Sequence, residues 1–322
     1  MTGIDRFLGC HYHKVRVGDT TYTAADMKHF MLQSVEKYCE EAGKTVKDLR
    51  KVGTPFVDEN IIPDADCERP GTLGEAACSI LMKALYGGRL ARADVLKAIT
   101  ELGAYVSNWT VACDVKMHRL FCYLYHNLDE YMMMIIGDDT DKLELKLYTD
   151  ADLAGEKAHT RSTSGNLLAI EGPNSFAPIG FQVKTQKATA EATCESEICS
   201  LNLGLRGTGI AALDLWEVIL QRKLVLHVQE DNEAAIKVVR KGYSPALRFL
   251  HRTQNVRLSW LYEVFQSDFA KLHHCASERM RADPLTKSFS VAKWSLALAQ
   301  LGFMSLAQMP AALRELIVKC HG

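Results

Sequence analysis

The sequence has little of what marks a secreted or membrane-bound protein. Its ten cysteines form no Cys-X-X-Cys pair, and its first residues, "MTGIDRFLGC", carry charges where a signal peptide has an apolar core. No apolar run approaches the roughly 20 residues that cross a bilayer; the densest is "YMMMIIG" (131–137). We therefore expect reduced, mostly buried thiols in a soluble intracellular protein, cytoplasmic or nuclear and not secreted.

The sequence also lacks a strong charge of either sign. The formal net charge of the 322 residues is −1, so whole-chain electrostatics indicate no particular partner. Hydrophobic residues make up 48% and charged residues 24%, as in a globular protein with one large domain or two ordinary ones. The "HHC" run at 273–275 has no second ligand pair at zinc spacing, so we do not expect zinc there.

Two kinds of pattern divide the chain near residue 140. The first 140 residues predict a mainly helical module, and the ranges with apolar residues at helical spacing are 23–43, 72–88, 93–109 and 115–132. The next part predicts, in order, strands at 143–150, 163–172 and 174–184, a helix from about 189, a strand at 223–231, helices at 232–242 and 252–266, a strand at 270–276 and a broken helix at 278–289. An amphipathic helix is expected over 292–319. We therefore predict a helical tether at 1–140, an α/β domain at 141–290 and a C-terminal helical extension at 291–322.

Acidic residues fall at the ends of predicted strands. Asp150 ends the first strand in "LYTDADLAG" (147–155), and Asp231 ends the fourth. If these two strands are parallel neighbours, their carboxyl ends meet at one edge of the sheet, where α/β proteins usually build sites. On the predicted helix, Glu197 lies one turn before Leu201, on the side expected to be buried against the sheet. Glu195 lies about 200° away around the helix axis. If Asp283 closes over the same edge, these four acids would form a cluster that two divalent ions about 4 Å apart would neutralise.

Each of these acids also has a structural interpretation. Strand-end aspartates often form turns or helix caps. Asp231 could cap the helix at 232–242, and Asp283 could shape a turn before Pro284. The order of all four acids favours a metal site, while any one of them alone favours a structural role.

Five segments resemble the ribonuclease H region in Pol polyproteins of copia-type LTR retrotransposons. They are, in chain order, "LYTDADLAGEKAHTRSTSG", "ATCESEICSL", "VQEDNEAAIKV", "LRFLHRTQNVRL" and "RADPLTKSF". Weaker likenesses, "RFLGCHY", "VGTPF" and "LARADVLKAITELGAYVSN", are similar to the region that joins the polymerase to ribonuclease H. No Tyr-X-Asp-Asp motif is present, so the resemblance covers the C-terminal part of Pol without the polymerase palm.

The resemblance implies a ribonuclease H-like mixed sheet flanked by helices and a two-metal endonuclease. Its metal-binding and catalytic carboxylates would be Asp150, Glu197, Asp231 and Asp283, with two Mg²⁺ ions that Mn²⁺ can replace. The substrate would be the RNA strand of an RNA–DNA hybrid, and a reverse transcriptase domain outside this chain would be a partner. Two departures stand out: Leu153 replaces a tryptophan, and 255–259 ("NVRLS") replace His-Ile-Asp-Val-Arg.

A local basic stretch indicates nucleic-acid contact. Between residues 234 and 259 there are six basic residues and no acid. Such a stretch can follow a phosphate backbone, although a solvated helix face has the same composition. The nucleic-acid-binding candidates are Arg161, Lys237, Arg240, Lys241, Arg248 and Arg252. Two alternatives to the ribonuclease stay open: a decayed retroelement remnant that binds nucleic acid without cutting it, and another nuclease or transferase on this fold.

Overall fold

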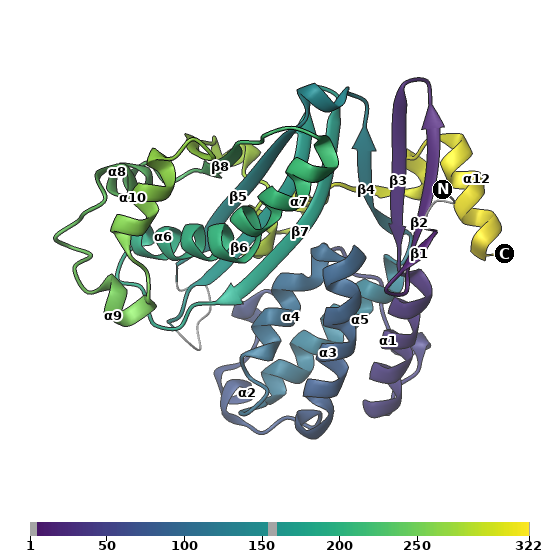
Figure 1. Cartoon of the computed structure of the whole chain (residues 1–322). Helices are drawn as coiled ribbons and strands as arrows, with labels where there is room; N and C mark the ends of the chain where they lie inside the picture. The colour runs from purple at the N-terminus through teal and green to yellow at the C-terminus, as the bar shows by residue number, and fades with distance from the viewer. Residues whose placement is uncertain (1–4, 154–159, 322) are drawn as a thin grey trace. The chain divides into compact units, whose positions relative to one another are not determined.

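The computed structural model describes residues 5–153 and 160–321 and divides into two compact units (Figure 1). The first unit comprises Met1–Val17, Thr21–Met134 and Ser288–Gly322, and the second comprises Gly18–Thr20 and Ile135–Lys287. Residues 291–322, predicted as a separate C-terminal extension, cluster with the first unit, as do Ser288–Ser290 from the predicted α/β domain.

The first unit combines a helical layer with short antiparallel strands. Its helices are α1 (Lys28–Glu41), α2 (Asp64–Glu68), α3 (Gly74–Ala91), α4 (Leu96–Gly103), α5 (Val111–His126), α11 (Val291–Leu301) and α12 (Ala311–His321). Its strands are β1 (Arg6–Phe7), β2 (Cys10–Val17), β3 (Thr20–Asp26), β4 (Glu130–Ile136) and β10 (Phe303–Ser305). They are hydrogen-bonded in the order β1-β2-β3-β4, with β10 also on β4.

Each predicted helix of this unit is present, but the first begins only at Lys28, because residues 23–26 pair as the end of β3. The strands of this unit were not predicted. The predicted helix at 115–132 ends at His126, because the run from Glu130 leaves the helix and pairs as β4. The expected C-terminal helix is interrupted at Gly302, whose φ of 86° only glycine adopts readily. Phe303 then pairs with Met132 of β4. At Gly18, with φ of 59°, the chain turns from β2 into β3.

A buried polar chain joins α11 to the helices of the first unit. Arg92 donates to both oxygens of Asp94, at 3.0 and 2.7 Å. Tyr123 Oη donates to Asp94 at 2.8 Å, and Trp294 Nε1 donates to Tyr123 Oη at 3.1 Å. Each of these buried polar side chains therefore has a hydrogen-bond partner, as buried polar groups in folded proteins usually do.

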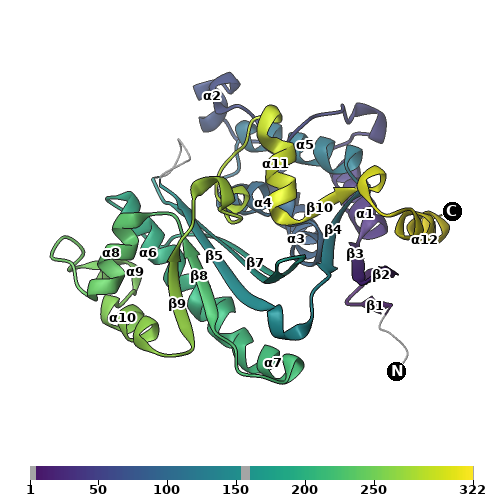
Figure 2. The ribbon, with the colours of Figure 1, turned by 90° about the horizontal axis from the view of Figure 1, so that it is seen from above.

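The second unit is a five-stranded mixed sheet flanked by helices. Its strands are β5 (Glu144–Asp152), β6 (Thr163–Gly172), β7 (Ser175–Thr185), β8 (Leu226–Glu230) and β9 (Ala270–His274). Its helices are α6 (Thr193–Gly204), α7 (Ile210–Leu220), α8 (Glu233–Lys241), α9 (Leu250–Gln254) and α10 (Leu258–Gln266). The order is β7-β6-β5-β8-β9. Figure 2 shows β5, β8 and β9 side by side. β5, β6 and β7 form an antiparallel meander, and β8 and β9 run parallel to β5. This is the strand order of the ribonuclease H-like fold, so the predicted fold class is confirmed.

Three local predictions for this unit need correction. The helix expected over 252–266 is two helices, because Asn255 takes a left-handed conformation (φ 61°) that ends α9. β8 ends at Glu230, one residue before Asp231. Asp283 lies in a single 3₁₀ turn, Asp283–Leu285, because Pro284 cannot continue a longer helix from the preceding turn.

Glycines on the long helical segment after residue 193 permit close packing on the sheet. Five residues, Leu205–Gly209, form a π turn between α6 and α7, so the helical path continues through the glycines expected to weaken it. A Cβ at Gly209 would lie 2.7 Å from Leu226 Cδ2 and 3.0 Å from Leu147 Cδ2. Both leucines are fully buried, so neither has room to move.

We expect Gly209→Ala to lower the free energy of unfolding by about 1–3 kcal/mol, the usual cost of overpacking a core. Urea unfolding followed by circular dichroism would measure it. Gly103→Ala is the matched control, because a Cβ at Gly103 meets nothing within 4 Å. Equal stability of the Gly209→Ala and Gly103→Ala variants would contradict the packing explanation.

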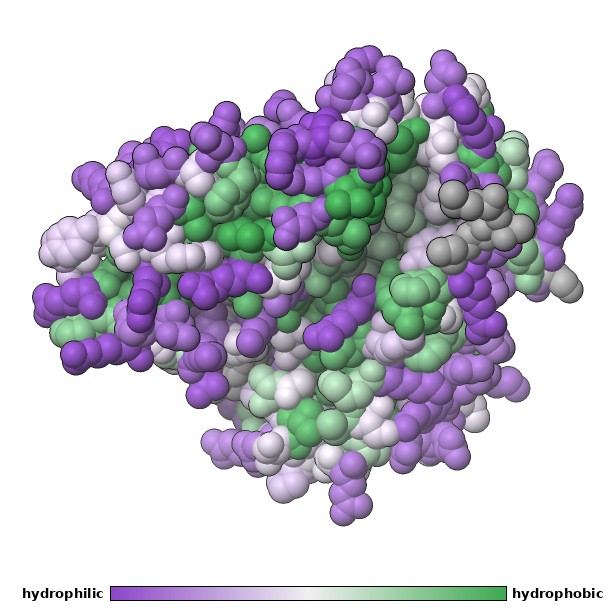
Figure 3. Space-filling model, in the orientation of Figure 1, coloured by the Kyte–Doolittle hydropathy of each residue, from purple (hydrophilic) through white to green (hydrophobic). Residues whose placement is uncertain are grey.

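The α7 helix exposes much of its apolar surface. Leu215, Val218 and Ile219 are 60%, 68% and 52% exposed. Hydrophobic surface is visible in the region where Figure 1 places α7 (Figure 3).

No helix among the described residues is both long enough and apolar enough to cross a membrane. The ten cysteines are free thiols and six are buried, as predicted.

Candidate active site

Parallel pairing brings the two strand-end aspartates to one edge of the sheet. Tyr148 of β5 lies opposite Gln229 of β8, so Asp150 and Asp231, two residues further on in each chain segment, follow in the same register. Asp150 is fully buried, and Asp231 is half-buried and accepts a hydrogen bond from Ser277 Oγ at 3.0 Å. The condition stated for these two strands, that they are parallel neighbours, is met.

The structure also brings the other two predicted acids to this edge. Carboxylate oxygens of Asp150, Asp231 and Asp283 lie within 4.8 Å of one another. α6 packs on β5 and β6 and turns Glu197 inward, where its side chain is 3% exposed. Glu195, one of its neighbours on α6, instead accepts the backbone N–H of Glu191 at 2.9 Å. The helix geometry therefore distinguishes the two glutamates as expected.

A fifth carboxylate, Glu230, was missed by the sequence interpretation. Its oxygens form a second group within 4.8 Å with those of Glu197 and Asp231. Glu230 is fully buried, and it accepts hydrogen bonds from Thr149 Oγ1 at 3.0 Å and from Asn232 N–H at 3.1 Å. Side chains alternate between the two faces of a strand, so Glu230 lies on the same buried face of β8 as Leu226 and Val228. This period of two is the sequence signal that could have identified Glu230 as a buried acid.

Lys287 is a cation that faces these acids. Its Nζ lies 3.1 Å from Asp150 Oδ1 and 2.7 Å from Asp283 Oδ1. The neighbouring Thr286 Oγ1 donates to Asp150 Oδ2. Both residues stand in the "RADPLTKSF" segment, and the spacing of four between Asp283 and Lys287 was the signal for this pair.

The surplus of negative charge disfavours ionisation of several members. Burial, followed by the neighbouring carboxylates Glu230 and Asp150, raises the pKa of Glu197 well above its usual range. Burial is also the main cause that raises the pKa of Glu230 and of Asp283. The carboxylates of this edge outnumber the ammonium of Lys287, so they cannot all carry charge without further cations.

The donor set fits hard divalent cations. All five acidic side chains offer oxygen atoms, which Mg²⁺ and Mn²⁺ prefer. Glu197 Oε2 is buried and has no hydrogen-bond partner among the described residues. A cation ligated by this oxygen would satisfy it, and would relieve the repulsion described above.

The six predicted nucleic-acid-binding residues are all solvent-exposed. Lys237 is paired with Glu233 at 2.9 Å, and Arg240 donates to the carbonyl of Leu272 at 3.2 Å. The guanidinium of Arg248 lies over the ring of Phe249 at 4.7 Å. Five of these residues therefore lie accessible along α8 and the segment that runs through α9, whereas Arg161 lies apart from them in sequence, just before β6.

A basic pocket of about 190 Å³, which the sequence did not predict, lies where the end of β7 meets α6 and the loop after α9. Three basic residues, Lys184, Lys187 and Arg206, are among its lining, together with Asn202 and Asn255. The amide of Gln254, which also lines it, is bonded to the backbone of Ala188. Arg206 stacks over Trp260 at 4.0 Å, which fixes its guanidinium. The pocket has the hydrogen-bond donors that an anionic oxygen requires.

The strand order and the acidic edge define a ribonuclease H-like α/β protein. The chain is 24% identical over 286 residues to the retrovirus-related Pol polyprotein from transposon TNT 1-94 of Nicotiana tabacum. That match covers 84% of this chain and 20% of the relative, so the chain spans about a fifth of the relative's length. The resemblance to a retrotransposon Pol polyprotein is thereby confirmed. No protein-family model matches the chain.

Two solved structures are similar to part of the chain. One is LC11-RNase H1, isolated from compost by a metagenomic approach, with 16% identity over 44% of this chain and 92% of that chain and a TM-score of 0.26. The other is LC11-RNase H1 in complex with an RNA/DNA hybrid, with 17% identity over 44% and 94% and a TM-score of 0.27.

Proposed function

We propose that the chain is a metal-dependent endonuclease that cuts the RNA strand of RNA–DNA hybrids, and we place this activity in residues 141–290. The observation that carries the proposal is the convergence of Asp150, Glu197, Asp231 and Asp283 at the carboxyl edge of β5 and β8. The similarity to a retrotransposon Pol polyprotein supports it.

The chain's own carboxylates would hold two Mg²⁺ ions. One group of carboxylate oxygens comes from Asp150, Asp231 and Asp283. The other comes from Glu197, Glu230 and Asp231, so Asp231 belongs to both groups. Bound divalent ions would supply an activated water and neutralise the leaving oxygen. Lys287 would orient Asp150 and Asp283 through its two ion pairs, which restrict the rotation of both carboxylates.

The basic groups of the second unit would hold the nucleic acid. Exposed cations on α8 and α9 suit the regular phosphates of a duplex, and the pocket lined by Lys184, Lys187 and Arg206 suits one backbone phosphate. The 2′-hydroxyl is the group that distinguishes the RNA strand from DNA. A polymerase domain outside this chain would be the partner that produces the hybrid.

Incubation of the purified chain with labelled nucleic acids tests this proposal. The substrates are an RNA–DNA hybrid, an RNA duplex and a DNA duplex, each with Mg²⁺, with Mn²⁺ or with chelator. We expect cleavage of the RNA strand of the hybrid alone, and only with a divalent ion. Hybrid binding without cleavage would instead identify a binding remnant, and cleavage of the DNA duplex would identify a different nuclease.

The combined Lys184→Ala and Lys187→Ala variant is expected to weaken hybrid binding about 10-fold or more at moderate salt. Removing a cation that neutralises one phosphate should reduce the slope of log affinity against log salt by about 1. Fluorescence anisotropy over a salt series measures both quantities. Lys223→Ala is the matched control, because Lys223 is exposed, pairs with Glu217 and precedes the opposite end of β8. Equal salt slopes for both variants would contradict the assignment of the pocket.

A further inference from the structure

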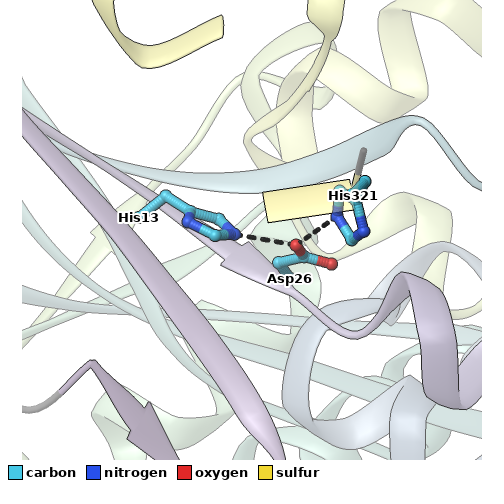
Figure 4. A group of neighbouring side chains, drawn as sticks. All are labelled: His13, Asp26 and His321. Atoms are coloured by element: carbon cyan, nitrogen blue, oxygen red, sulfur yellow. Dashed lines mark hydrogen bonds and ion pairs between the residues drawn. The ribbon is translucent and has the colours of Figure 1, made fainter. Parts of the chain in front are cut away.

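Three side chains converge in the first unit. His13 lies on β2, Asp26 is the last residue of β3, and His321 is the last residue of α12 (Figure 4). The Nε2 atom of His13 lies 2.8 Å from Asp26 Oδ2, and the Nε2 atom of His321 lies 2.7 Å from the same oxygen. Segments 295 residues apart in sequence thus meet at one carboxylate oxygen.

The carboxylate at the centre of this group is fixed in orientation. Asp26 and His13 are 3% and 7% exposed. The second carboxylate oxygen, Asp26 Oδ1, accepts the backbone N–H of Lys28 at 2.9 Å. Hydrogen bonds of this kind hold a ligand side chain in the direction that coordination requires. The side chain of His321 is 26% exposed, so the group is reachable from solvent on that side.

Hydrogen bonds to the central carboxylate also favour its charged form. Burial alone would raise the pKa of Asp26, but hydrogen bonds from His13, from the Lys28 backbone and from His321 outweigh burial and lower the pKa. Each imidazole could offer its Nε2 to a cation after that nitrogen gives up the proton it shares with Asp26, because a neutral imidazole can carry its proton on Nδ1 instead.

We propose that His13, Asp26 and His321 form a second metal site, selective for a borderline divalent ion such as Zn²⁺. Two imidazole nitrogens and one carboxylate oxygen suit zinc, whereas the all-oxygen cluster of the second unit suits Mg²⁺. The three ligand atoms lie within 4.8 Å of one another. Bonds of about 2.0–2.1 Å would need only a small opening of the present contacts, to about 3.3 Å between ligand atoms, and would leave a fourth position to water.

Metal bound there would tie the last turn of α12 to the β2–β3 hairpin. In the absence of metal, the two histidines hold the same elements through hydrogen bonds to Asp26. A coordinated ion would replace these bonds by stronger ones, so its effect would be structural. The site is independent of the proposed nuclease activity.

Zinc binding to the full-length chain tests the proposal. The parent for all variants carries Cys320→Ser, because the exposed thiol of Cys320 precedes His321 and is itself a type of zinc ligand. Zn²⁺ is titrated calorimetrically in excess Mg²⁺, and Co²⁺ is titrated with visible absorption as the readout. His321→Gln is the principal variant, because its partly exposed site at a helix end tolerates replacement. His251→Gln, an exposed histidine of the second unit, is the control.

We expect His321→Gln to lose one equivalent of zinc binding, or to weaken it at least 10-fold, together with the zinc-dependent rise in melting temperature. Asp26→Asn should do the same, and His251→Gln should match the parent. Equal zinc stoichiometry and affinity in His321→Gln and the parent would overturn the proposal. So would a Co²⁺ spectrum in His321→Gln that is identical to that of the parent. Either result leaves the hybrid-cleavage proposal untouched.

Discussion

Glu197→Gln is expected to reduce cleavage of the hybrid by at least about 100-fold, in the range seen when one charge-stabilising group is removed from an active site. The substitution keeps the size of the side chain but removes the negative charge that a bound cation would stabilise on Glu197, whose Oε2 has no hydrogen-bond partner among the described residues. Cleavage of labelled RNA at saturating enzyme measures the effect, and hybrid affinity measured by anisotropy should change little.

Glu195→Gln provides the matched control for this effect. Glu195 is also a buried glutamate of α6, but its carboxylate accepts the backbone N–H of Glu191, and it lies in neither acidic group. A glutamine can accept the same hydrogen bond, so we expect activity within about 3-fold of wild type. Equal losses in the two variants would show that α6 responds to any loss of charge and would contradict the assignment of Glu197.

Glu230→Gln is expected to stabilise the metal-free chain by about 1–3 kcal/mol at pH 8, the size of the penalty for burying a polar group without full compensation. Burial raises the pKa of Glu230 from its ordinary 4.5 to about 8. The folded state therefore binds more protons than the unfolded state between these values, and the stability of wild type falls as the pH rises through this window.

The two proteins should converge below pH 4.5, where Glu230 is protonated in both the folded and the unfolded state. Urea unfolding between pH 4 and 8.5, in chelator, measures the difference. Glu233→Gln is the control: Glu233 is exposed and paired with Lys237, which lowers its pKa, so its removal should not stabilise the chain. A Glu230→Gln variant less stable than wild type at pH 8 would show that the hydrogen bonds of the carboxylate outweigh its desolvation.

The fold of the second unit was predictable because its strands alternate and its turns are marked. The range 163–172, predicted as a strand, coincides with β6, and the parallel neighbours β5 and β8 follow from the order of elements. The strands of the first unit escaped prediction, because β2 mixes polar and apolar residues and β10 is held by its pairing with β4. Tertiary pairing, which local pattern does not encode, decides such short strands.

The acids of the site were predictable for a similar reason, and their partners were not. Asp150, Glu197, Asp231 and Asp283 follow from strand ends, helix geometry and the resemblance, whereas Lys287 and Thr286 depend on how the turn at Asp283 folds back onto Asp150. The pocket at Lys184 and Arg206 joins segments that only the tertiary structure brings together.

The most direct test of the central claim compares wild type with Asp150→Asn on a labelled RNA–DNA hybrid, in Mg²⁺ or Mn²⁺. Both proteins are first shown to be folded and to bind the hybrid. We predict metal-dependent cleavage of the RNA strand by wild type and its loss in Asp150→Asn. Cleavage that survives in Asp150→Asn, or its absence in folded wild type that binds the hybrid, would contradict the assignment of this acidic edge as the nuclease centre.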